Sequence, residues 1–207
     1  MDEDLVLSKF RVVCEEFGGE VKGGYHWPRS CYLPDYDNFK AFIQWMHRNQ
    51  YDFKKGELSA YYEDAPDLIT YSMSKGVSSL QIRRHMDFDT LAEVNKIIFP
   101  NQISNAHEDY IQNGDELFFT AAEKKRIISS IKNKPFRKNA TVNLSYDTTD
   151  EEEGYWYADI NLHIPIEKNV KLSLLLKDAE DTTYLLMHQI EKRYKRKIQA
   201  CVGGKHA

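Results

Sequence analysis

The sequence has few of the residues that cross-link small folds or interrupt regular structure. Its 207 residues include 3 cysteines, 10 glycines and 6 prolines. No apolar run approaches the roughly 20 residues that a membrane-spanning helix needs. These scarcities exclude a disulfide scaffold and a collagen-like chain, and they predict a protein with no membrane association.

The cysteines, Cys14, Cys31 and Cys201, are odd in number and form no C-x-x-C pair. We therefore expect reduced thiols, with neither a redox motif nor a zinc site. Residues 1–4 are mostly acidic, where a secretory signal would be basic. These features predict a cytoplasmic protein and leave the oligomeric state open.

Recognisable catalytic signatures are missing. The sequence contains no phosphate-binding loop, dinucleotide-binding glycine motif, zinc-protease His-Glu-x-x-His motif or nucleophile elbow. A His/Asp cluster at 85–89 and the alternating Asp159, Asn161 and His163 are the remaining candidates for a metal-dependent hydrolase. Helix capping and a solvated strand face explain them more simply. We therefore expect a non-enzymatic protein with no catalytic residues, no metal and no cofactor.

The residues that are present are typical of a folded chain. Apolar residues make up 42% and aromatic residues 13%, enough large side chains to form a core. Apolar residues at helical spacing predict helices over 6–17, 39–46, 91–98, 103–111, 120–134 and 183–198. Period-two alternation predicts strands over 69–73, 80–82, 142–146, 160–166 and 170–174. In the second half we expect a buried set formed by Ile160, Leu162, Ile164, Val170, Leu172, Leu186 and Ile190.

The order of these elements predicts an α+β fold. Each half is expected to follow the order α-β-β-β-α, which gives two helix-flanked antiparallel three-stranded sheets and an internal duplication. The proposed boundary separates residues 1–113, with a leading helix and a Gly/Pro loop, from residues 114–207, with basic helices. The first half has a net charge of -6 and the second of +2.

A long Gly/Pro segment over 18–36 is the first candidate binding surface. Long irregular loops are unusual in compact domains, and this one contains the residue types that dominate protein interfaces. The alternative is an Ω-type loop whose aromatic side chains cover the core. The candidate partner-binding residues are Tyr25, His26, Trp27, Arg29 and Tyr32.

Basic residues on two predicted helices of the second half form the other candidate surface. Side by side, the two helices would present a positive patch able to neutralise phosphates. The alternative is dipole compensation and an ordinary solvated helix face. The candidate nucleic-acid-binding residues are Lys124, Lys125, Lys192, Arg193, Lys195 and Arg196.

The absent catalytic motifs, the acidic first half and the aromatic loop together predict a non-enzymatic protein-binding or inhibitory protein. A small acidic chain of this kind is consistent with a phage or mobile-element inhibitor of a host defence enzyme. The alternative is a nucleic-acid-binding protein that uses its basic C-terminal half.

Overall fold

The computed structural model describes residues 3–23, 29–51, 57–64, 67–89, 121–133, 139–149, 155–167 and 170–203. Within these residues the elements are, in chain order, α1 (Glu3–Glu16), β1 (Glu20–Lys22), β2 (Arg29–Tyr32), α2 (Tyr36–Arg48), β3 (Leu58–Asp64), β4 (Asp67–Ser74), β5 (Val77–Asp89), α5 (Ala121–Lys132), β6 (Thr141–Thr149), β7 (Tyr155–Ile166) and α6 (Leu172–Gly203). The helices predicted over 91–98 and 103–111, and the boundary after residue 113, lie outside the described residues.

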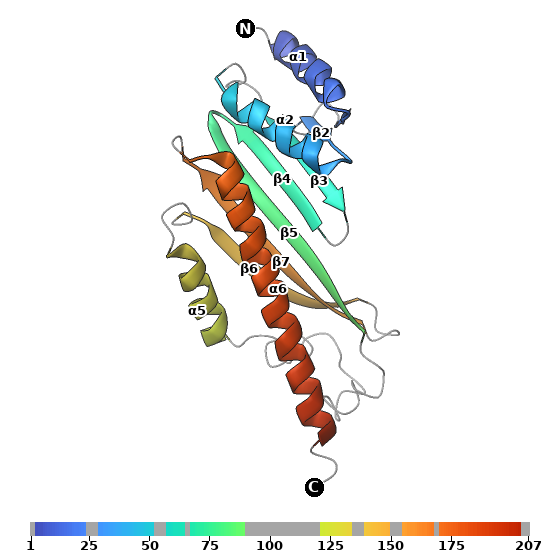
Figure 1. The fold of residues 1–207 in the computed structure, drawn as a ribbon, viewed down its shortest axis with the longest axis vertical. Helices are drawn as coiled ribbons and strands as arrows, with labels where there is room; N and C mark the ends of the chain where they lie inside the picture. Colours follow the sequence, from blue (N-terminus) through green and yellow to red (C-terminus); the bar gives the residue numbers. More distant parts are fainter. Residues whose placement is uncertain are drawn as a thin grey trace.

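All seven described strands belong to one sheet, in the order β1-β2-β3-β4-β5-β7-β6 (Figure 1). β2 and β3 are parallel because α2 carries the chain back between them, and every other neighbouring pair is antiparallel. The prediction of two separate three-stranded sheets is wrong. β5 pairs with β7 from Ser78 to Asp89, and this long ladder joins the two halves into a single layer.

Strand alternation gives the sheet two different faces. On one face, side chains such as Ile69, Leu80 and Leu162 are buried, and α2 and α6 lie across this face (Figure 1). On the other face the alternating positions are mostly polar and partly exposed, as at Thr70 and Gln81. The fold is therefore a mixed α+β arrangement whose core lies between one sheet face and the helices.

The predicted strand over 170–174 is wrong, because α6 begins at Leu172. The Lys171 carbonyl accepts hydrogen bonds from the backbone of Leu174 and Leu175, at 3.0 and 3.1 Å. Leu172 and Leu175 are buried, whereas Leu174 is 63% exposed, a pattern that fits helical rather than period-two spacing. The described second half therefore has two strands rather than three, and the predicted duplication is not found.

Thr182 and Thr183, which the sequence suggests as the entry to the last helix, lie inside α6. Their hydroxyl groups donate to the carbonyl oxygens of Asp178 and Glu180, at 2.7 and 3.0 Å. Such bonds satisfy a threonine within a helix, so these residues do not cap its start. Although α6 is 32 residues long, no helix in the described ranges is long and apolar enough to cross a membrane.

The expected core of the second half is largely confirmed. Val170 is only partly buried, packed against the core. The confirmed buried residues are Ile160, Leu162, Ile164, Leu172, Leu186 and Ile190. The predicted helix over 39–46 is also confirmed as part of α2, and Asp35 caps it by accepting a 2.8 Å hydrogen bond from the backbone of Asn38.

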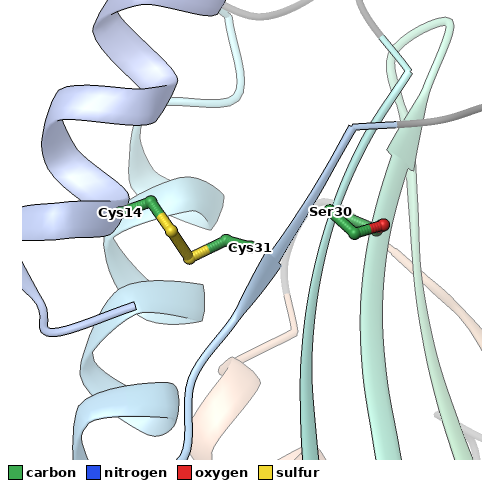
Figure 2. Close-up of a disulfide and its surroundings, with 4 residues drawn as sticks. Cys14, Ser30 and Cys31 are labelled. Atoms are coloured by element: carbon green, nitrogen blue, oxygen red, sulfur yellow. A yellow bond between two sulfur atoms is a disulfide. The ribbon is translucent and has the colours of Figure 1, made fainter. Parts of the chain in front are cut away.

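The expectation of reduced thiols is wrong for two of the three cysteines. Cys14 on α1 and Cys31 on β2 form a disulfide, and both residues are fully buried (Figure 2). Cys31 points toward α1, while the next side chain, Ser30, leaves β2 on the opposite side. A Cβ atom added to Gly19 would lie 2.7 and 2.9 Å from the two sulfur atoms, so this turn needs glycine.

Candidate functional site

The described part of the candidate partner-binding segment lies at one edge of the sheet, where β1 and β2 pair in antiparallel fashion. Tyr25, His26 and Trp27 lie outside the described residues, so their role stays a prediction. Arg29 and Tyr32 belong to β2 and are partly exposed. The segment is thus not irregular throughout, since its two ends are strands of the sheet.

Tyr32 already has intramolecular neighbours. Its ring centroid lies 5.2 Å from that of Tyr61 on β3, and the Lys22 ammonium group lies 4.4 Å from the Tyr32 ring. Contacts of these kinds stabilise the exposed side of the sheet. Tyr32 therefore helps to hold the edge hairpin to β3, which is a sufficient structural reason for a tyrosine at this position.

The six candidate nucleic-acid-binding residues divide between α5 and α6. Lys124 and Lys125 lie near the start of α5, and the other four lie in the C-terminal half of α6. The two helices run side by side in opposite directions (Figure 1), and Arg126 and Gln189 line one shared groove. The start of α5 therefore lies near the point where the basic segment of α6 begins.

Not every basic side chain in this region is available to a ligand. The Lys195 ammonium group lies 2.6 Å from the Glu191 carboxylate one turn earlier. This hydrogen bond lowers the pKa of Glu191. Lys124 and Arg193 are only partly exposed, whereas Lys125, Lys192 and Arg196 are exposed. The positive surface is therefore narrower than the sequence predicts.

A groove with a volume of about 610 Å³ lies between α5 and α6. We call it the α5–α6 groove. It is lined by Arg126, Ile127, Ser130, Ile131, Asp178, Asp181, Thr182, Leu185, Leu186 and Gln189. Four of these lining residues are aliphatic and six are polar or charged, so the groove is more polar than a typical small-molecule pocket.

Leu185 is the least expected residue in the α5–α6 groove. It is 64% exposed, while its neighbour Leu186 is 4% exposed and belongs to the core. A single exposed leucine is common on protein surfaces. Leu185 differs from such a residue because it lies in a concave site, where a partner could cover it from several sides.

A buried arginine of the sheet contacts α6 beside the residues that line this groove. The guanidinium group of Arg84 on β5 forms an ion pair with the Asp67 carboxylate on β4, and its side chain is fully buried. Arg84 Nε also donates to Thr183 Oγ1 at 2.5 Å, and the guanidinium carbon lies 3.7 Å from the centroid of the Tyr184 ring. A buried charge needs such partners. These contacts fix the rotation of α6 and hence the direction of Leu185.

A second contact ties α6 to the first half. The Tyr36 hydroxyl group at the start of α2 donates to Glu180 Oε1. Burial, and then the neighbouring carboxylate, raise the pKa of Tyr36, so this phenol keeps its proton to a higher pH than an ordinary tyrosine. Both attachment points lie on the first half of α6, on the side that faces the sheet rather than α5.

The two His/Asp clusters of the sequence meet across the β5–β7 ladder. His85 Nδ1 lies 3.0 Å from Asp159 Oδ1, and both side chains are partly exposed. No group of three or more His, Cys, Asp or Glu side chains within the described ranges could hold a metal ion. The pair is therefore a cross-strand contact on the polar face of the sheet.

No protein-family model, curated protein or solved structure matches the chain at a significant level. The residues and their geometry must therefore carry any functional argument. The α5–α6 groove could not be located from the sequence, because it depends on how two helices separated by two strands lie beside each other. The pair Leu185-Leu186 does not reveal it, because adjacent apolar residues also occur within a single buried stripe, as Phe42 and Ile43 do on α2.

Proposed function

We propose that the protein is a non-enzymatic protein-binding protein and that the α5–α6 groove is its binding site. The observation that carries this proposal is the groove of about 610 Å³ with Leu185 exposed inside it. Covering the exposed 64% of Leu185 contributes about 1–2 kcal/mol. A few anchors of this size dominate the binding free energy in many protein interfaces.

A matched pair of substitutions tests the site. Leu174 and Leu185 are both on α6 and are 63% and 64% exposed, but only Leu185 lines the groove. A phage-displayed peptide library is selected on the full chain, and the enriched peptides are measured against Leu185→Ser and Leu174→Ser. We expect Leu185→Ser to weaken binding by about tenfold or more and Leu174→Ser to leave it unchanged. A selection that yields no Leu185-dependent peptide contradicts the proposal.

Inhibition of a host defence enzyme by a phage or mobile-element protein is the more specific form of this proposal. It is supported by the absence of catalytic motifs from the sequence and by a surface suited to binding. Phage plating on hosts that carry defence systems would test it, with the protein expressed as wild type or as Leu185→Ser. We expect protection of the phage by the wild type only.

Nucleic-acid binding is the second candidate, because antiparallel α5 and α6 bring Lys125 and Arg126 near the segment that contains Lys192 and Arg196. Fluorescence anisotropy with labelled duplex DNA tests it. If phosphates are the ligand, affinity should fall steeply with salt, and Lys192→Ala should reduce the log–log slope by about 0.9. Absence of binding at low salt rules this candidate out.

A further inference from the structure

We infer that the α5–α6 groove takes an acidic, leucine-containing segment of a partner protein, with its carboxylates over the C-terminal half of α6. This inference rests on the proposed protein-binding function and names the chemistry of the partner. It follows from the way apolar and charged groups are distributed along the groove.

Helical spacing extends the groove side of α6 into the basic segment. The groove-lining residues Leu185 and Gln189 are four residues apart, and Lys192 and Arg196 continue the same stripe at steps of three and four. Both cations are exposed. On the facing helix, Arg126 lines the groove at the end nearest to Gln189.

The opposite end of the groove has a different charge. Asp178 and Asp181 line it there, and Lys177 forms an exposed ion pair with Asp181, with a distance of 3.0 Å between Nζ and Oδ2. A carboxylate of the partner would gain little at this end, where Lys177 already pairs with Asp181, and would be attracted to the end formed by Arg126, Lys192 and Arg196. Charge complementarity of this kind selects partners and their orientation.

The middle of the groove favours a peptide over a nucleic acid. Ile127 and Leu185 offer aliphatic surface between the two charged ends. A phosphate backbone requires cations but gains nothing from an aliphatic floor. A segment with leucine-type side chains and a cluster of carboxylates at one end satisfies both parts of the groove.

Three synthetic peptides test the inference on the full chain. The first carries leucines at helical spacing with glutamates gathered in one half. The second replaces these glutamates with lysines, and the third replaces the leucines with serines. We expect the first to bind, and the other two to bind at least about tenfold more weakly or not at all.

Charge-reversal variants locate the acidic contact. Lys192→Glu combined with Arg196→Glu should weaken binding of the Leu/Glu peptide by about tenfold or more. Lys9→Glu combined with Arg11→Glu on α1 changes the net charge by the same amount and should leave binding of the Leu/Glu peptide unchanged. Circular dichroism melts check that both variants remain folded. Equal losses in the two variants would contradict a local acidic contact.

The remaining outcomes separate this inference from the proposed function. If Leu185-dependent peptides emerge from the library but are indifferent to Lys192→Glu with Arg196→Glu, the groove binds proteins and the acidic segment is wrong. If labelled duplex DNA binds through Lys192 and Arg196 and Leu185→Ser does not change that binding, the proposed function and the acidic segment are both wrong. If neither the Leu/Glu peptide nor the library yields a Leu185-dependent ligand, both are likewise overturned.

Discussion

The two ends of the sheet are packed in different ways. At the end near α1 and α2, a disulfide joins α1 to β2, and the ring centroid of Phe42 lies 5.8 Å from that of Phe10 and 5.5 Å from that of Phe17. At the other end, α5 and α6 leave a groove of about 610 Å³ between them. Of the α5 isoleucines, only Ile131 is buried, and Ile127 and Ile128 are partly buried.

The two ends of the sheet therefore differ in how much they contribute to stability and in whether their apolar surface lines a groove. The end with the disulfide buries its aromatic cluster in the core and so contributes stability, while its exposed apolar side chains, Leu5, Val12 and Tyr51, line no groove of the described residues. The end with the groove leaves aliphatic surface uncovered, which lowers its contribution to folding and makes it available for binding. The buried contacts of Arg84 connect the two ends, because they link β4 and β5 to α6.

The largest loss of stability is expected from a substitution in the aromatic cluster formed by Phe10, Phe17 and Phe42. Phe42 is fully buried between Phe10 and Phe17. Phe42→Ala should therefore cost about 3–5 kcal/mol in the free energy of unfolding, measured by urea denaturation. Val12→Ala is the control, since Val12 lies on α1 but is 53% exposed, and it should change stability by less than about 0.5 kcal/mol. Similar costs for the two variants would show that this end is not tightly packed.

The next largest loss of stability is expected when the disulfide is removed. Cys14 and Cys31 are 17 residues apart, and closing a loop of this size stabilises a fold by about 3 kcal/mol. Replacing both cysteines with alanine should lower the free energy of unfolding by about that amount. Alkylation under denaturing, non-reducing conditions followed by mass spectrometry should label Cys201 alone.

The disulfide also bears on the cytoplasmic location expected from the sequence. Such bonds persist in oxidising compartments and are rare in the cytosol. The cytoplasmic location stays a prediction, and labelling of all three cysteines in protein taken directly from cells would favour it. Labelling of one would favour an oxidising compartment.

Tyr71 provides a pH-dependent effect within the core. Burial raises the pKa of Tyr71 from 10.0 to about 12, although its hydrogen bond to Ser78 acts in the opposite direction. The folded state therefore holds this proton more tightly than the unfolded state. The resulting stability is present below pH 10 and is lost as the pH rises to about 12, a loss of about 3 kcal/mol.

Tyr71→Phe tests this effect. The variant should cost about 1 kcal/mol near neutral pH because the hydroxyl group bonds to Ser78. It should then lose less stability than the wild type between about pH 8 and about pH 11. Urea midpoints at the two pH values provide the measurement. Parallel losses in both proteins would mean that other groups account for the alkaline sensitivity.

The sequence predicts local structure better than long-range pairing, for physical reasons. The α2 helix, its Asp35 cap and the buried face of β7 follow from spacing within a few residues. The segment Val170–Leu174 fits both periods equally well, and packing of Leu175 and Leu176 decides in favour of helix. The β5–β7 ladder and the Cys14–Cys31 disulfide depend on tertiary placement, which no local pattern encodes. The α5–α6 groove was missed for the same reason.

The sharpest test of the comparison uses two adjacent leucines, of which Leu185 gives the smallest expected effect on stability. Leu186 is 4% exposed, so Leu186→Ala should cost about 2–5 kcal/mol. Leu185 is 64% exposed, so Leu185→Ala should change the free energy of unfolding by less than about 0.5 kcal/mol.

When peptide binding is measured under folded conditions, Leu185→Ala should have the larger effect of the two variants and Leu186→Ala the smaller. Leu185→Ala removes a groove side chain directly, whereas Leu186 touches the groove but is mainly a core residue. A large loss of stability in Leu185→Ala would mean that this side chain supports the fold. The groove end would then be part of the packed core, and the contrast between the two ends of the sheet would disappear.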